Sequence, residues 1–127
     1  MTSTMTPPET ATRLGTVVVV DDEVETCESL RDLFEDEGYV VRTAYNGRDA
    51  LMLLREMPVK PCVVILDLIM PVLDGNSVYR QMKLDPQLAE IPVVISTSDP
   101  ARAPAGLPIL RKPITLDVLL RLVRRCC

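Results

Sequence analysis

The stretch VVILDLIMPVLDG, residues 63–75, decides the fold class of this chain. Its first four residues are branched and apolar, which is typical of a strand buried on both faces of a sheet. Asp67 ends this run, and a carboxylate in that position has to be solvated, paired or functional. The other segments of the chain decide between these alternatives.

Segments with strand character alternate with segments of helical character. Strands are expected at residues 16–20, 39–44, 62–66, 91–97 and 107–110, and helices at 23–38, 47–57, 75–85 and 115–125. This alternation predicts a parallel sheet with right-handed crossovers. Arg42 and Pro108 favour edge positions for the second and fifth strands. We therefore predict an α/β fold, a flavodoxin-like, doubly wound parallel sheet of five strands in the order 2-1-3-4-5.

The connection between the fourth and fifth strands departs from this pattern. Residues 98–106 include Pro100, Pro104 and Gly106. A proline inside a helix costs about 3 kcal/mol, and the residue before a proline is pushed away from the helical conformation. A crossover of about 10 residues is also at the lower limit for a βαβ unit that contains a helix. The fourth helix of the fold is therefore expected to be missing or reduced to one turn.

Composition argues against several functional classes. The 127 residues suit one globular domain, placed at 15–127 after a Thr- and Pro-rich leader at 1–14 that is expected to be disordered. A net charge of −4 argues against nucleic acid as a partner, and no apolar run approaches the length of a membrane span. The chain has no histidine, which excludes His-dependent catalysis and His-ligated metals. The five glycines are too far apart for a nucleotide-binding loop.

The cysteines indicate little about function. Cys27 and Cys62 fall in apolar segments and are expected to be small core residues. Cys126 and Cys127 are expected to be two exposed thiols; a lipidated tail is the weaker alternative, because no polybasic stretch precedes them. Residues 1–13 contain no hydrophobic secretion signal, so a reducing, cytoplasmic location is expected.

Polar side chains gather where the predicted strands end, which is where doubly wound sheets bind their ligands. These residues are Asp21, Asp22, Asp67, Thr97 and Lys112. Each has a structural explanation by itself, such as a helix cap or a turn, but their convergence favours a common site. Three close carboxylates repel one another unless a cation joins them, and an all-oxygen site that also takes a phosphoryl group is typical of Mg²⁺. An aspartate beside that ion can act as a nucleophile towards phosphorus.

The motifs VVVVDDE and DLIMPVLDG, followed by Thr97 and by Lys112 with its proline, resemble the receiver domain of bacterial two-component response regulators over about residues 16–125. The resemblance implies that Asp67 is the phospho-acceptor. It also implies that Asp21, Asp22 and Asp67 hold Mg²⁺ together with the backbone carbonyl of Ile69.

The resemblance further implies that Lys112 contacts the phosphoryl group, that Thr97 is the switch hydroxyl, and that the Lys112–Pro113 peptide is cis. The expected phosphodonor is a sensor histidine kinase or a histidine phosphotransfer protein, docking around the first helix, and the downstream protein target is unknown. We expect a stand-alone phosphorelay or protein-binding receiver, with no output domain and slow self-dephosphorylation rather than enzymatic turnover.

Two residues depart from the family pattern. Ile109 stands where the family has an aromatic residue, which puts the family's coupling between hydroxyl and aromatic in question. The side chain of Ile69 cannot hydrogen-bond an attacking water, hence the expected slow dephosphorylation. Two alternatives stay open: an interaction module that is never phosphorylated, and an aspartate-nucleophile phosphatase. The phosphatase is disfavoured because Ile69 occupies the place of the second acid in its Asp-x-Asp motif.

Overall fold

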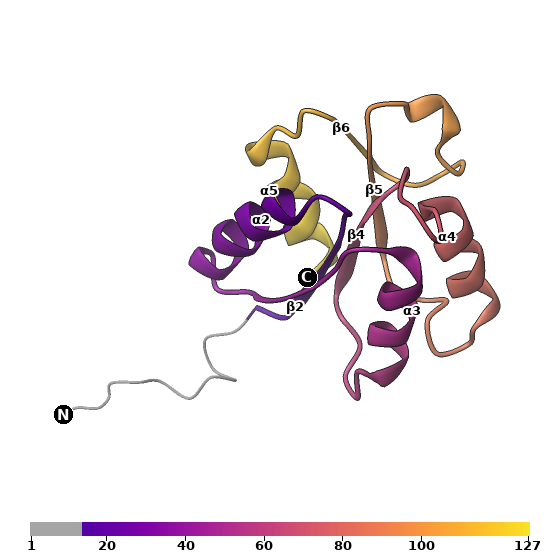
Figure 1. Cartoon of the computed structure of the whole chain (residues 1–127). Coiled ribbons are helices and arrows are strands. Elements are labelled where there is room, and N and C mark those ends of the chain that lie inside the picture. The colour runs from indigo at the N-terminus through magenta and orange to yellow at the C-terminus, as the bar shows by residue number, and fades with distance from the viewer. Residues whose placement is uncertain (1–13) are drawn as a thin grey trace.

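The computed structural model describes residues 14–127, so the expected leader lies almost wholly outside the described residues. Five strands form one parallel sheet with helices on both faces (Figure 1). The strands are β2 (Thr16–Val20), β3 (Val40–Ala44), β4 (Val63–Asp67), β5 (Val93–Thr97) and β6 (Ile109–Arg111). Their order is β3-β2-β4-β5-β6, which confirms the predicted order 2-1-3-4-5 and the edge positions of the second and fifth strands.

Four helices cover the two faces of the sheet. They are α2 (Val24–Asp36), α3 (Gly47–Glu56), α4 (Gly75–Leu84) and α5 (Leu116–Cys126). In Figure 1, α2 and α5 lie on one side of the sheet and α3 and α4 on the other. The helix ends agree with the sequence prediction to within two residues.

Each face of the sheet has its own hydrophobic core, because successive side chains of a strand point to opposite faces. Val17, Val19, Val63, Ile65 and Val94 pack in one core with buried residues of α2 and α5. Their sequence neighbours pack in the other core with α3 and α4. All five residues of β4 are buried, which is why its sequence is continuously apolar until Asp67.

The connection from β5 to β6 contains a single 3₁₀ turn, Pro100–Arg102, where the fold normally places a helix. This confirms the expectation drawn from its prolines and its length. The side chain of Asn76 in α4 donates a hydrogen bond to the carbonyl of Arg102 at 3.1 Å, which ties the turn to its neighbour. Strand β6 begins at Ile109 rather than 107, and the carbonyl of Pro108 still accepts a hydrogen bond from the Ile95 amide at 2.9 Å.

The fold also contains one cis peptide bond and one disulfide among the described residues. The Lys112–Pro113 peptide is cis, as the family resemblance implied. Cys62 and Cys127 form a disulfide across 65 residues of sequence, so the expectation of a simple core thiol at Cys62 and a free thiol at Cys127 is wrong. Cys126 is a free thiol as expected, but it is partly buried, and Cys27 is free and buried.

Among residues 14–127, no helix is long and apolar enough to cross a membrane.

Candidate functional site

Three carboxylates meet at the carboxyl edge of the sheet. Asp21 and Asp22 follow β2, and Asp67 is the last residue of the adjacent strand β4. One carboxylate oxygen from each residue lies within 4.8 Å of the other two. Asp21 and Asp67 are only 3% and 4% exposed, whereas Asp22 reaches solvent. The parallel register thus brings together acids that lie 45 or more residues apart in the sequence.

Lys112 is the cation of this group. Its backbone amide donates to the carbonyl of Thr97 at 2.9 Å, which extends the β5–β6 pairing by one residue. Its Nζ atom then lies 3.2 Å from Asp21 Oδ2 and 3.4 Å from Asp67 Oδ1. The ammonium therefore bridges the two buried carboxylates and leaves the exposed Asp22 without a share of it.

The protonation of the site follows from burial and from these charges. Burial raises the pKa of Asp67 to about 6, the Asp21 carboxylate adds to the increase, and Lys112 opposes it. Burial disfavours the charged form of Lys112, but Asp21 and Asp67 together outweigh it, and the pKa of Lys112 is raised. Asp67 is therefore mostly ionised at neutral pH, at a cost that one lysine does not cancel.

A hard divalent cation fits this donor set. Three carboxylate oxygens converge within 4.8 Å while a single ammonium faces them, so negative charge is left over. All of the converging anionic donors are oxygen atoms, which suits Mg²⁺ rather than a thiophilic metal. The backbone of Ile69 borders the same cleft, and its amide lies 3.4 Å from Asp67 Oδ1.

The segment from Leu68 to Asp74 is held close behind Asp67 by Gly75. A Cβ atom at Gly75 would lie 2.4 Å from the carbonyl oxygen of Asp67, so only glycine permits this approach. The Gly75 amide donates to the carbonyl of Leu68 at 2.9 Å. Asp74 caps α4 by accepting a hydrogen bond from the Ser77 amide at 2.8 Å, and this bond lowers the pKa of Asp74.

Thr97, which ends the strand next to β4, and Ser98 after it form another part of the wall of the site. A cleft of roughly 360 Å³ is lined by Asp22, Glu23, Asp67, Ile69, Thr97, Ser98 and Lys112. The Oγ1 atom of Thr97 accepts a hydrogen bond from the Asp99 amide at 3.0 Å, which leaves its proton available for another acceptor. All the residues predicted for the site therefore border one cleft or the acidic group beside it.

Two polar residues at this edge were missed by the sequence analysis. The Glu23 amide donates to Asp21 Oδ1 at 2.9 Å, and its side chain lines the cleft. The third acid of the DDE run was a visible signal for it. Ser96 pairs with Asp67 in the β4–β5 register, and its Oγ atom is the buried side-chain atom that has no hydrogen-bond partner among the described residues. A polar residue after Val93, Val94 and Ile95 was a visible signal for Ser96, but its burial beside Asp67 follows only from the strand register.

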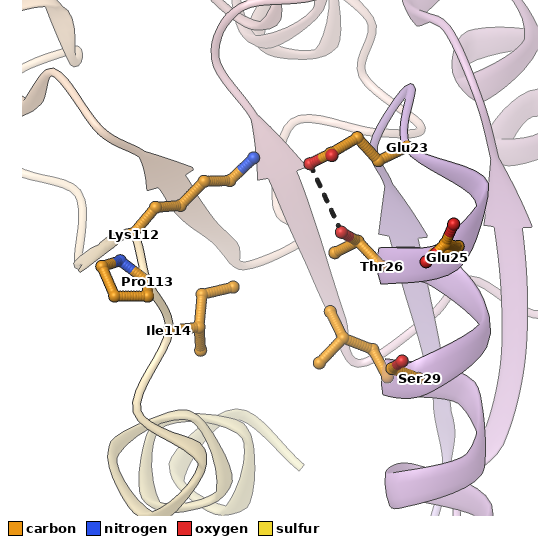
Figure 2. A pocket seen from close by; sticks show the side chains of 8 residues that line it. Glu23, Glu25, Thr26, Ser29, Lys112, Pro113 and Ile114 are labelled. Carbon is orange, nitrogen blue, oxygen red and sulfur yellow. Dashed lines mark hydrogen bonds between the residues drawn. The ribbon is translucent and has the colours of Figure 1, made fainter.

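A second groove opens beside the acidic cleft (Figure 2). Lys112, Pro113 and Ile114 form one wall, and Glu23 with residues of α2, including Thr26 and Ser29, forms the other. Glu23 and Lys112 border both hollows, so a protein bound in this groove would lie next to Asp67.

Comparison with known proteins gives consistent results. The family profile described as the response regulator receiver domain matches residues 17–124. Protein PilH of Pseudomonas aeruginosa is 30% identical over 117 residues, which cover 87% of this chain and 95% of PilH. Response regulator MprA of Mycolicibacterium vanbaalenii is 36% identical over 113 residues, but this chain spans only 48% of MprA. The structure of chemotaxis response regulator CheY4 of Vibrio cholerae superposes with a TM-score of 0.78 at 27% identity, covering 88% of this chain and 98% of that one.

Proposed function

The chain belongs to the family of response regulator receiver domains, and from this premise we propose that it carries a signalling phosphoryl group on Asp67. The observation that carries the proposal is the position of Lys112, whose Nζ atom lies within 3.4 Å of both buried carboxylates at the end of the apolar strand. Residues 15–127 are proposed to form the receiver domain. A cytoplasmic location and an unknown downstream protein target belong to the same proposal.

The proposed reaction is transfer of a phosphoryl group to an oxygen of the Asp67 carboxylate. A P–O bond forms at Asp67 as the P–N bond of a phosphohistidine breaks, and the departing imidazole nitrogen keeps the electron pair and takes up a proton. With a pKa of about 6, Asp67 is mostly the anion that this attack requires at neutral pH. The chain contains no histidine, so the phosphohistidine belongs to a sensor histidine kinase or a histidine phosphotransfer protein.

The neighbouring residues have separate tasks. Asp21, Asp22 and Asp67, with the backbone carbonyl of Ile69, would hold Mg²⁺, which when bound supplies positive charge to the phosphoryl oxygens. Lys112 is within reach of Asp67 and pairs with the transferred group. The hydroxyl of Thr97, at the rim of the same cleft, donates a hydrogen bond to one of its oxygens.

The phosphodonor is proposed to dock on the groove between α2 and the segment after β6 (Figure 2). This groove leads to Asp67 past Lys112, and its α2 wall carries apolar Leu30 next to small polar residues. The β5–β6 connection is reduced to one turn, so the face that it borders is a poorer candidate for phosphorylation-dependent binding.

Incubation with Mg²⁺ and acetyl phosphate, followed by intact mass measurement, tests this function. We expect one added phosphoryl group on the wild type, none on Asp67→Asn, and one on Asp32→Asn, an exposed aspartate of α2 that serves as the matched control. Wild-type protein that stays unmodified with Mg²⁺ and donor in excess would favour the alternative, an interaction module that works without phosphate. Phosphate that persists on Asp67→Asn would place the acceptor elsewhere.

A further inference from the structure

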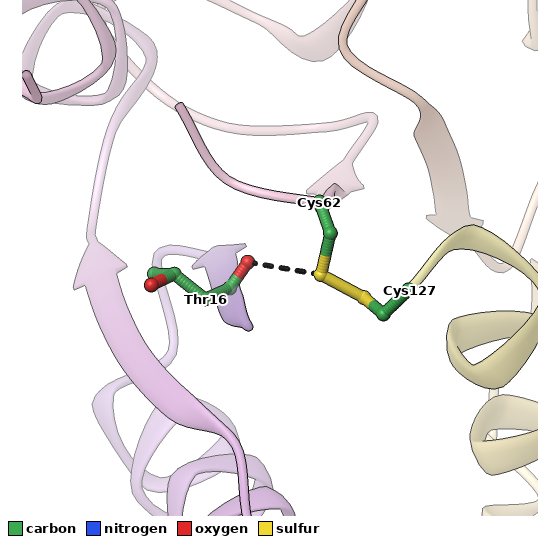
Figure 3. Close-up of a disulfide and its surroundings, with 3 residues drawn as sticks. All are labelled: Thr16, Cys62 and Cys127. Carbon is green, nitrogen blue, oxygen red and sulfur yellow. Dashed lines mark hydrogen bonds between the residues drawn. A yellow bond between two sulfur atoms is a disulfide. The ribbon is translucent and has the colours of Figure 1, made fainter. Parts of the chain in front are cut away.

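The disulfide between Cys62 and Cys127 lies at the amino end of β4, and the acidic cleft lies at the carboxyl end of the same strand. Cys62 directly precedes β4, whose other end carries Asp67, and Cys127 directly follows α5 (Figure 3). The two Cα atoms are 5.2 Å apart, within the range that a disulfide can span. The bond therefore fastens the end of α5 to the start of the strand that bears Asp67.

The sulfur of Cys62 has a fitted place whether or not it is bonded to Cys127. The Cys62 amide donates to the carbonyl of Thr16 at 3.0 Å, which sets the residue at the start of the β2–β4 pairing. Its Sγ atom lies 3.4 Å from the same carbonyl oxygen, so a reduced thiol has an acceptor there (Figure 3). A Cβ atom at Gly15 would come within 3.1 Å of this sulfur, and glycine leaves the room that it needs.

The two neighbouring cysteines at the end of α5 differ in access. Cys127 is an exposed residue, which places it where thiols and disulfides from solution can approach. Cys126 is partly buried against the core formed with α2, and burial raises the pKa of its thiol, which lowers its thiolate fraction. Thiol–disulfide exchange needs a thiolate that a partner in solution can approach. Of the two cysteines, Cys127 meets this requirement better than Cys126.

Helix α5 packs on the core through one face, and Val123 and Cys126 belong to this packing near its end. Its fully buried side chains are Leu119 and Val123. Beyond them, Arg124 pairs with Glu37 at 3.1 Å, but both side chains are solvent-exposed, and ion pairs of that kind contribute little. The covalent link to Cys62 therefore adds, directly after the last turn of the helix, a restraint that packing and this ion pair do not supply.

We infer that Cys62 and Cys127 form a reversible thiol–disulfide exchange site that takes low-molecular-weight thiols and disulfides such as glutathione and controls how firmly α5 is held. Disulfides in reducing compartments are usually transient rather than permanent, and the cytoplasmic location proposed above exposes this one to glutathione. The site uses neither Asp67 nor Lys112, so it stands whether or not the chain is phosphorylated.

The exchange balances with oxidised glutathione as the oxidant. The Cys127 thiolate attacks one sulfur of that disulfide and releases one glutathione thiolate, leaving a mixed disulfide at Cys127. The Cys62 thiolate then attacks the Cys127 sulfur and releases the second glutathione thiolate. The two thiol protons pass to the two released thiolates, and the two electrons lost by the protein are gained by glutathione; reduction runs the same steps backwards.

The test equilibrates the folded full-length protein in buffers of varied reduced-to-oxidised glutathione ratio, then alkylates it under denaturing conditions. In oxidising buffer we expect two alkylated thiols, Cys27 and Cys126, and a linked peptide pair containing Cys62 and Cys127. In reducing buffer we expect four. Cys126→Ser is the matched control and keeps the linkage, whereas Cys127→Ser loses it.

Thermal unfolding supplies a second measurement, because closing a long loop restricts the unfolded chain. Oxidation is expected to raise Tm by about 10 °C in the wild type and in Cys126→Ser, and to leave Cys127→Ser unchanged. Cys127 is exposed, so its substitution does not threaten folding. Four alkylated thiols in oxidising buffer, a linkage through Cys126, or a bond that reduced glutathione leaves intact would each overturn the inference.

Discussion

Replacing Asp67 with asparagine should stabilise the protein at neutral pH, although it removes the proposed phospho-acceptor. Asp67 is buried next to Asp21, and Lys112 compensates only part of the cost. Its pKa rises from the ordinary value of 3.8 to about 6 in the folded protein. A difference of about 2 pKa units corresponds to about 3 kcal/mol at most. Asparagine keeps the shape of the side chain without its charge, so the variant escapes this penalty.

The sign of the pH dependence follows from the raised pKa. Well below pH 3.8, Asp67 is neutral in both the folded and the unfolded chain, and its ionisation does not affect stability. As the pH rises through about 6, the folded protein must bear a buried charge that the unfolded chain solvates easily. The stability gain of Asp67→Asn should therefore be small near pH 4, grow as the pH rises to about 6, and level off above about 7.

Urea denaturation in metal-free buffer at pH 4.5 and pH 7.5 measures this difference as a shift of the midpoint at constant slope. Mg²⁺ should raise the midpoint of the wild type at pH 7.5 more than that of the variant, since the variant lacks one of the three carboxylates. Asp32→Asn, on the exposed side of α2, should shift neither midpoint. An Asp67→Asn variant that is less stable than the wild type at pH 7.5, or whose gain is equal at both pH values, would refute this reasoning.

The remaining predictions concern single positions around the same edge. Asp22→Ala should abolish Mg²⁺ binding measured by titration calorimetry, and an unchanged isotherm would remove Asp22 from the proposed ligand set. Ile69→Asn should accelerate loss of phosphate from Asp67, because an amide can orient an attacking water; an unchanged lifetime, followed by intact mass, would contradict this. Val72→Asn should raise the free energy of unfolding by about 1 kcal/mol, since a β-branched residue at φ 72° is strained and asparagine tolerates that conformation; a lower Tm would count against it. Gly75→Ala should destabilise the protein despite the better helix propensity of alanine, because its Cβ atom would lie 2.4 Å from the Asp67 carbonyl oxygen; an unchanged denaturation midpoint would show that the chain can yield there.

The fold was predictable because its main signals are local. Continuous apolar runs identified β2, β4 and β5 as central strands, and single polar or proline residues marked the edges. The missing helix was predictable for the same reason, since prolines act on the conformation of their own neighbourhood. The starts of β5 and β6 were predicted two residues too early, because a strand begins where hydrogen bonding to the neighbouring strand begins, and not where the apolar run begins. Strand β5 starts at Val93, paired with Val64, and not at the apolar Ile91.

The candidate site was predictable as a set of residues, but its electrostatics were not. In a parallel sheet the carboxyl ends of all strands meet at one edge, so the topology alone places Asp21, Asp67 and Lys112 together. Which carboxylate bears the larger desolvation cost depends on burial and on distances of a few ångströms. The inclusion of Glu23 in the cleft likewise depends on how the chain turns between β2 and α2.

The disulfide could not be predicted from the local sequence around either cysteine. Cys62 lies beside an apolar run, which favoured a core thiol, and Cys127 follows a helix, which favoured an exposed free thiol; the structure instead has a half-buried Cys62 bonded to an exposed Cys127. Their pairing arises only after α5 packs along the sheet and its last turn arrives beside the amino end of β4, across 65 residues of sequence. The acids thus lie at the carboxyl edge of the sheet, and the disulfide lies at its amino edge, where the end of α5 meets the residue before β4. Strand β4 connects the two, because Cys62 directly precedes it and Asp67 ends it. The disulfide therefore fastens the end of α5 to the amino end of the same buried strand whose carboxyl end holds Asp67.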